Sequence, residues 1–184
     1  MFEAVILGRG GQGAQTAGNQ LAQALFAQGL YVQTFSTYGG ARRGTPVTSS
    51  LRADAAPIRL RANITRADAL LCFDDSLIDA GFLSLAKPGA VCVVNSALPV
   101  TAFDAPDGVT ILPVDGRSIA RRNDMGKVVN SALLGGFVAA VGSPDIDTMC
   151  RIIEATAPAK KVQNVASCRE AYAIAQGQRE EVDA

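Results

Sequence analysis

The first 29 residues place an apolar run, a glycine-rich turn and a run of helix-forming residues in immediate succession. Residues 5–7 have the character of a buried strand, and Gly8, Gly10 and Gly13 follow at G-x-G-x-x-G spacing. This spacing lets the backbone turn tightly and approach a ligand or a packed helix closely. The helix expected over residues 14–27 begins with unpaired amides, which favour a bound anion. The segment therefore predicts a strand, a turn and a helix with the geometry of a phosphate-binding site.

The second predicted strand lacks the residue that a dinucleotide site needs. In such a site this strand ends in Asp or Glu, whose carboxylate binds the ribose hydroxyls. Here residues 31–35 run into Ser-Thr-Tyr-Gly at 36–39, with no carboxylate. Two interpretations of the glycine turn stay open: it binds a phosphate, or it only packs locally or contacts a partner chain. Both are favoured over an intact NAD site.

Composition and charge favour one α/β domain over residues 1–184, with a flexible polar tail at 176–184. The 17 Lys and Arg balance the 17 Asp and Glu, so no overall field attracts nucleic acid or an anionic membrane. No basic leader precedes the first strand, and no apolar stretch reaches the ~20 residues of a membrane helix. We expect a cytoplasmic protein that binds neither nucleic acid nor membrane.

Residues for redox or metal chemistry are missing or dispersed. The chain has no histidine, which removes the usual general base and the commonest metal ligand. Cys72, Cys92, Cys150 and Cys168 are too far apart for a C-x-x-C or iron–sulfur motif. We expect packed or surface thiols, and we predict no catalytic residue and no metal site on this chain.

The rest of the chain alternates between strand-like and helix-like segments. Further strands are expected at 45–51, 58–61, 69–73, 90–95 and 109–114, and further helices at 78–85, 127–141, 146–156 and 165–175. The short connection between the first two of these strands predicts a hairpin, and residues 69–95 predict a βαβ unit. The predicted fold is α/β, a three-layer Rossmann-like domain with a mostly parallel, mixed sheet.

The helix at 127–141 is apolar on most faces, which predicts that it is buried between the sheet and another element. Gly135 and Gly136 lie in its middle. Each costs about 1 kcal/mol of helix stability relative to Ala. Such a cost suggests that a neighbouring element packs closely against this helix.

A second glycine-rich segment, residues 38–47, contains Arg42 and Arg43. Loops that follow parallel strands emerge at one edge of a sheet, so we expect Arg9, Arg42 and Arg43 to converge there. Guanidinium groups bind phosphate and carboxylate bidentately, on a ligand or on a neighbouring subunit. The simpler interpretation is that Arg42 and Arg43 are solvated surface charges beside turn glycines.

Three motifs carry a resemblance that covers nearly the whole chain. They are Gly-Arg-Gly-Gly-Gln-Gly at 8–13, Gly-Gly-Ala-Arg-Arg-Gly-Thr-Pro-Val at 39–47, and Asn-Ser-Ala-Leu-Leu-Gly-Gly-Phe at 130–137. The chain resembles the gamma subunit of 2-oxoacid:acceptor oxidoreductases, and most closely the pyruvate or branched-chain type. In that type an acidic residue usually precedes the two arginines, where this chain has Ala41. An aromatic 2-oxoacid such as phenylglyoxylate also remains open.

The resemblance implies a heteromeric enzyme that decarboxylates a 2-oxoacid on thiamine diphosphate, passes electrons through [4Fe-4S] clusters and transfers the acyl group to coenzyme A. Alpha, beta and delta-type subunits would be the partners, with ferredoxin or NAD as acceptor and FAD on a further subunit in some forms. The gamma chain would bind none of these cofactors alone. Its loops would border the active-site cleft or the coenzyme A entrance through Gly8, Arg9, Gly10, Gly11, Gln12, Gly13, Arg42, Arg43, Gly44 and Asn130.

Two other hypotheses compete with this one: a free-standing nucleotide-binding enzyme that uses the first glycine turn, and a small-ligand regulatory module. The missing ribose carboxylate and the missing histidine count against the first. The second rests on fold analogy alone.

Overall fold

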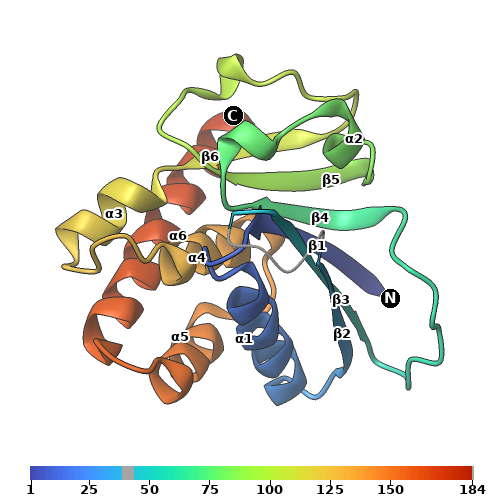
Figure 1. The fold of residues 1–184 in the computed structure, drawn as a ribbon, viewed down its shortest axis with the longest axis horizontal. Coiled ribbons are helices and arrows are strands. Elements are labelled where there is room, and N and C mark those ends of the chain that lie inside the picture. Colours follow the sequence, from blue (N-terminus) through green and yellow to red (C-terminus); the bar gives the residue numbers. More distant parts are fainter. Residues whose placement is uncertain (39–43, 184) are drawn as a thin grey trace.

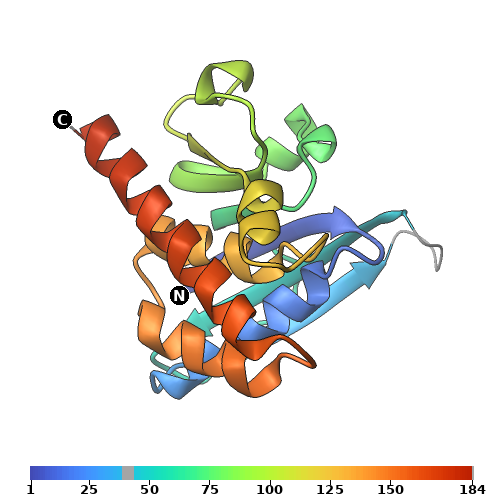
Figure 2. The same ribbon diagram turned by 90° about the vertical axis from the view of Figure 1, so that its left-hand side faces the viewer.

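The computed structural model describes residues 1–38 and 44–183, which form a mixed six-stranded sheet with helices on both faces (Figure 1). The strands are β1 (Phe2–Arg9), β2 (Tyr31–Tyr38), β3 (Pro46–Asp54), β4 (Ala67–Cys72), β5 (Ala86–Asn95) and β6 (Thr110–Val114). The helices are α1 (Ala14–Ala27), α2 (Ala80–Leu83), α3 (Gly116–Arg122), α4 (Asn130–Val141), α5 (Ile146–Thr156) and α6 (Lys161–Asp183), with 3-10 turns η1 (Asp75–Leu77) and η2 (Val100–Ala102). Helices α1, α4, α5 and α6 lie together on one face (Figure 2). The predicted α/β fold is confirmed.

The strand order is β2-β3-β1-β4-β5-β6. The neighbours β1, β4, β5 and β6 run parallel, whereas β3 is antiparallel to both β1 and β2. The predicted βαβ unit is present, because α2 connects the parallel strands β4 and β5. The expected mixed sheet, parallel in most of its strand pairs, is therefore observed.

The predicted hairpin between residues 45–51 and 58–61 is wrong. Strand β3 continues to Asp54 and pairs along its length with β2, from Tyr31 opposite Asp54 to Tyr38 opposite Val47. Residues 58–61 are a mainly exposed loop instead of a strand. Because β3 lies between β1 and β2, both of its edges are already hydrogen-bonded, and a third strand has no edge to join.

Several element boundaries differ from those expected. Strand β5 begins at Ala86 instead of 90, next to a register irregularity in β4 between Ala67 and Ala69. Helix α4 begins at Asn130 instead of 127, and α6 spans Lys161–Asp183, well beyond the expected 165–175. Residues 176–183, expected to be a tail, therefore belong to α6.

Helix α4 is the buried centre of the helical layer. Residues 131–140 are all buried, and α6 crosses over the helix in Figure 2. A Cβ atom on Gly135 would lie 2.0 Å from the backbone oxygen of Cys168 in α6, and one on Gly136 would lie 2.8 Å from a methyl carbon of Val114 in β6. The predicted close packing at both glycines is confirmed, since neither position has room for a side chain.

Among the described helices, none is both long enough and apolar enough to span a lipid bilayer.

Candidate functional site at the carboxyl edge of the sheet

The carboxyl ends of β1 and β2 lie at the same edge of the sheet, although the two strands are not neighbours. Strand β3 lies between them and begins at this edge. The Gly10 amide donates to the Thr45 carbonyl at 2.8 Å, and the Gly44 amide donates to the Gly10 carbonyl at 3.3 Å. The two glycine segments therefore do meet. Arg42 and Arg43 lie outside the described residues, so their convergence with Arg9 stays a prediction.

Two of the three motif glycines are explained by packing. A Cβ atom on Gly8 would lie 3.1 Å from the Ala14 Cβ and 3.2 Å from the Phe73 Cβ. Gly13 has a φ of 91°, and a Cβ there would lie 2.1 Å from the Asn130 Nδ2. Gly13 therefore requires glycine through its positive φ, and Gly8 is tightly packed, whether or not a phosphate binds. Ligand contact by the turn stays a prediction.

Asn130, a predicted site residue, ties α4 to the glycine turn. Its Nδ2 donates to the Gly13 carbonyl oxygen at 2.8 Å. This bond joins residues that are 117 positions apart and lies where α1 begins and α4 begins. Asn130 thus fixes the end of the turn against the helical layer.

Asp74, at the end of β4, is the centre of a hydrogen-bond cluster on this edge. Its Oδ2 accepts from the Arg9 Nε at 3.0 Å and from the Gln12 Nε2 at 2.9 Å. Its Oδ1 accepts from the Ser76 hydroxyl at 2.5 Å and from the Ser76 amide at 3.2 Å. Gln12 also closes the turn on itself, because its Oε1 accepts from the Arg9 amide at 2.7 Å.

Arg9 is held by three partners. Besides Asp74, its NH2 group donates to the Ser76 hydroxyl at 2.9 Å and its NH1 group donates to the Gly44 carbonyl at 3.4 Å. Contacts within the described residues thus use three of the five guanidinium N–H donors. The side chain is 36% exposed. Arg9 therefore connects β1, β4 and the start of β3, and two of its N–H donors have no partner among the described residues.

The cluster also sets the ionisation of Asp74. Burial alone would raise the pKa of this carboxyl group. Hydrogen bonds from Ser76, Gln12 and Arg9 favour the charged form and outweigh burial, so the pKa of Asp74 is lowered. The carboxylate is therefore charged at neutral pH and balances the charge of Arg9.

The same edge continues along β5. The Asn95 Nδ2 donates to the Phe73 carbonyl at 3.0 Å, and its Oδ1 accepts from the Gly116 amide at 3.1 Å. The next residue, Ser96, donates its hydroxyl to the Asp75 carboxylate at 2.7 Å. These bonds join the ends of β4, β5 and β6 into a fixed polar rim.

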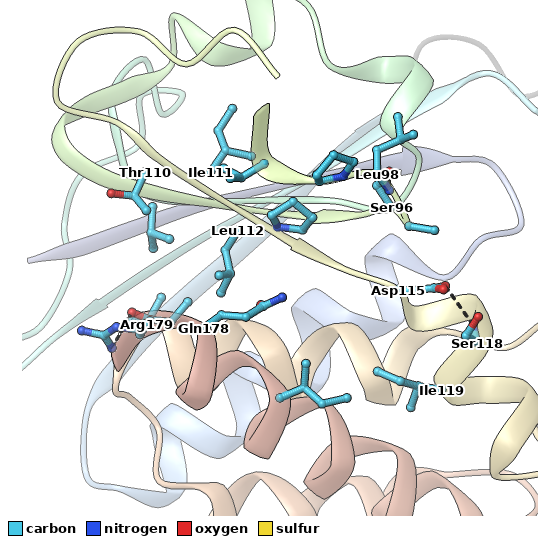
Figure 3. A pocket seen from close by; sticks show the side chains of 18 of the residues that line it. Ser96, Leu98, Thr110, Ile111, Leu112, Asp115, Ser118, Ile119, Gln178 and Arg179 are labelled. Atoms are coloured by element: carbon cyan, nitrogen blue, oxygen red, sulfur yellow. Dashed lines mark hydrogen bonds between the residues drawn. The ribbon is translucent and has the colours of Figure 1, made fainter. Parts of the chain in front are cut away.

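A hollow of about 1070 Å³ runs along β6, one of the two edge strands, and reaches the polar rim at Ser96 (Figure 3). Two of its charged side chains bond helix ends, and two others, Asp68 and Arg122, pair with Lys87 and Glu170. Asp115 accepts from the Ser118 amide at 2.9 Å at the start of α3, and Arg179 donates to the carbonyls of Ala139 and Ala140 at the end of α4. Sequence reasoning did not predict this hollow, and its charges already have internal partners.

The four cysteines are buried, as the expectation of packed thiols allows. Burial raises the pKa of Cys72 to about 12 and raises that of Cys92 as well. The hydrogen bond between Cys150 and Cys168 lowers the pKa of the first thiol and raises that of the second. Within residues 1–38 and 44–183, no three His, Cys, Asp or Glu side chains gather into a metal-binding group.

Sequence reasoning missed Asp74 and Ser76 as members of the site. The available signal was the polar run Asp-Asp-Ser directly after a buried strand, residues 74–76. In an open parallel sheet, such an end lies beside the turn that follows the first strand.

The comparisons with known proteins agree with this architecture. The family model described as pyruvate ferredoxin/flavodoxin oxidoreductase matches residues 3–174. The chain belongs to this family. It is 36% identical to "Pyruvate synthase subunit PorC" of Methanothermobacter marburgensis, over 94% of this chain and 96% of that protein. It is 35% identical to "Pyruvate/ketoisovalerate oxidoreductases common subunit gamma" of Pyrococcus furiosus, with the same coverage.

A solved structure supports the same assignment. The pyruvate oxidoreductase subunit PORC of Thermotoga maritima superposes with a TM-score of 0.83 at 26% identity, over 94% of this chain and 95% of that one. The chain is thus a gamma-type subunit of the pyruvate ferredoxin/flavodoxin oxidoreductase family, as the resemblance indicated.

Proposed function

We propose that this chain is the gamma subunit of a multisubunit enzyme that converts a 2-oxoacid and coenzyme A to acyl-coenzyme A and carbon dioxide. The reaction releases two electrons and one proton, and the electrons pass to ferredoxin or NAD. The observation that carries the proposal is the 36% identity to a pyruvate synthase subunit over nearly the full length of both chains. Pyruvate, a branched-chain 2-oxoacid and an aromatic one such as phenylglyoxylate are the candidate substrates.

Thiamine diphosphate and [4Fe-4S] clusters would supply decarboxylation and electron transfer, and we assign them to alpha, beta and delta-type partner subunits. The residues of this chain do not fit those groups. It has no histidine, its cysteines are not spaced as cluster ligands, and Cys72 and Cys92 have raised pKa values in the core. We assign no catalytic residue to this chain.

The role that we propose for this chain is to border the active-site cleft or the coenzyme A entrance with its carboxyl edge. Coenzyme A carries phosphates, which arginine binds with charge-assisted hydrogen bonds. Arg9 has two donors that no described residue engages, and Asp74 holds its guanidinium in place. Arg42 and Arg43 belong to the segment that ends at Gly44, next to Gly10. The edge would orient the coenzyme and keep bulk water from the cleft.

The alternative, a free-standing nucleotide-binding enzyme, fits this sheet less well. In a dinucleotide-binding domain the second strand lies beside the first and presents an acidic residue to the ribose. Here β3 separates β1 from β2, and no carboxylate follows β2 before residue 45. Gly13 is in addition covered by Asn130.

Purification of the chain from its native source, through an affinity tag, tests the proposal. We expect three further kinds of subunit, an iron–sulfur absorption spectrum, and dye reduction that depends on both a 2-oxoacid and coenzyme A. Assays with pyruvate, 2-oxoisovalerate and phenylglyoxylate identify the substrate. A chain that purifies alone and binds a nucleotide would support the alternative.

The role of the edge is tested in the same complex with the double variant Arg42→Ala, Arg43→Ala. Loss of one charge-assisted hydrogen bond corresponds to about a tenfold weaker interaction or more, so the KM for coenzyme A should rise by about that factor, or assembly should loosen. The thiamine diphosphate content of the partners should not change. The matched control is Arg151→Ala, Arg169→Ala, which removes two exposed arginines from α5 and α6. Normal assembly with an unchanged KM would show that Arg42 and Arg43 are only solvated charges.

A further inference from the structure

The loop between β3 and β4, residues 55–66, lies at the opposite edge of the sheet from the glycine turn. Strand β3 is antiparallel to β1, so it ends where β1 and β4 begin (Figure 1). The loop carries three exposed arginines, Arg59, Arg61 and Arg66, and no acidic residue. In a chain with a net charge of zero, this is a marked local excess of positive charge.

The acidic side chains beside this loop are already paired with other cations. Glu3 accepts from the Nε of the buried Arg52 at 2.8 Å, and Asp68 pairs with Lys87 at 2.9 Å. Asp54 pairs with the amino group of Met1 at 3.2 Å.

As a result, none of the three loop arginines has a salt-bridge partner in the part of the chain that the structure describes. Their charge is therefore available to a partner that brings carboxylates of its own.

Three contacts anchor the loop to the rest of the domain. The Leu60 carbonyl accepts from the Gln33 Nε2 at 3.1 Å, and the Ala56 amide donates to the Asp54 carboxylate at 3.1 Å. Ile64 packs into the core with 8% of its surface exposed. These anchors reduce the conformational entropy that the loop loses when a partner binds.

Two large, partly exposed apolar side chains belong to the same surface as the arginines. Leu60 is 44% exposed and Tyr31 is 49% exposed. Tyr31 lies two residues from Gln33 on the same face of β2, and Gln33 holds the Leu60 carbonyl. Tyrosine and arginine are enriched where protein interfaces concentrate their binding energy. This mixture favours a protein surface over nucleic acid, which calls for a broader basic face.

We propose that Tyr31, Leu60 and the loop arginines form a docking surface for a carboxylate-rich surface of another subunit of the oxidoreductase. The inference rests on the proposed function, because it takes its partner from that complex. It places this interface at the amino edge of the sheet, away from the glycine turn. The chain would therefore contact its complex at two opposite edges.

The test measures the Kd of this chain for the complex assembled from the remaining subunits. The variant is Arg59→Gln, Arg61→Gln, Arg66→Gln. We expect its Kd to be about tenfold higher at about 0.1 M salt. For the wild-type chain the Kd should rise steeply between about 0.1 M and about 1 M salt, as the Debye length falls from about 10 Å to about 3 Å. The variant should lose most of this dependence.

The matched control, Arg121→Gln, Arg151→Gln, Arg169→Gln, removes the same charge from exposed helical positions away from both edges and should keep the wild-type Kd. A loop variant with the same Kd and salt dependence as this control overturns the inference and leaves the proposed function standing. A wild-type chain that does not bind the remaining subunits overturns both. Binding to anionic vesicles or duplex DNA that the loop variant loses, with unchanged affinity for the subunits, assigns the surface to another ligand.

Discussion

Replacement of Asp74 by Asn tests whether this carboxylate holds the carboxyl edge together. The substitution keeps the shape of the side chain but removes the charge that Arg9 faces at 3.0 Å. One of the two carboxylate oxygens also becomes an amide, which cannot accept the bonds from Gln12 or from Ser76. We expect a chain that still folds but is less stable.

The magnitude follows from the exposure of the partners. The Arg9 side chain is 36% exposed, so its ion pair is screened by solvent and contributes no more than about 1 kcal/mol. A lost hydrogen bond from Gln12 or Ser76 adds about 0.5–1.5 kcal/mol. The sum is about 0.5–2.5 kcal/mol, which lowers the Tm by roughly 1–10 °C for a domain of this size.

The pH dependence has a definite sign. The pKa of Asp74 is lowered in the folded chain, so its ionisation contributes stability above the unfolded-state pKa of about 3.9. That contribution is lost as the pH falls through the lower, folded-state pKa. The difference in unfolding free energy between wild type and Asp74→Asn should be constant at neutral pH and shrink below about pH 4.

Urea unfolding and thermal melts of the chain at several pH values measure both effects. The control is Asp124→Asn, which removes the charge of a carboxylate whose side chain is 84% exposed and pairs with Lys160. We expect a change of less than about 0.5 kcal/mol there. If both variants lose the same small amount, Asp74 does not organise the edge and the reasoning fails.

Three further predictions concern packing, thiols and clusters. Gly135→Ala should destabilise the chain by about 1–3 kcal/mol in urea unfolding, because its Cβ meets the Cys168 backbone; Gly177→Ala, in open space on α6, should stabilise it by up to about 1 kcal/mol. Cys72 should resist alkylation until the chain is denatured, since its pKa is raised to about 12; peptide mapping of labelled native chain that finds modified Cys72 would contradict this. Reconstitution of the isolated chain with iron and sulfide should yield no stoichiometric [4Fe-4S] spectrum, because the cysteines lack cluster spacing.

The parts of the fold that depend on local signals were predictable from the sequence. Helix α1 occupies residues 14–27 as expected, because the glycine turn marks its start. Helix α5 begins where the Asp145 side chain accepts a hydrogen bond from the Thr148 amide at 2.8 Å. The sequence Ser-Pro-Asp at residues 143–145 predicts this helix start. The paired glycines of α4 predicted that another element packs closely against this helix, because each glycine lowers helix stability relative to alanine.

The parts that depend on distant pairing were not predictable in the same way. A hydrophobic period identifies a strand but does not select its partner, so β3 was paired with residues 58–61 instead of with β2. The Arg9–Asp74 contact joins positions 65 residues apart, and only the strand order brings them together. Residues 58–61 alternate between apolar and charged side chains, as a strand would, yet they form a loop that presents its arginines to solvent.

The most direct test of the central claim is a titration of this chain into the remaining subunits of its complex, purified without it, with coenzyme A-dependent oxidation of the 2-oxoacid as the readout. If the chain is the gamma subunit, activity should rise linearly with added chain and reach a plateau at a fixed stoichiometric ratio. Activity that is already maximal without the chain, or that does not respond to it, would contradict the claim.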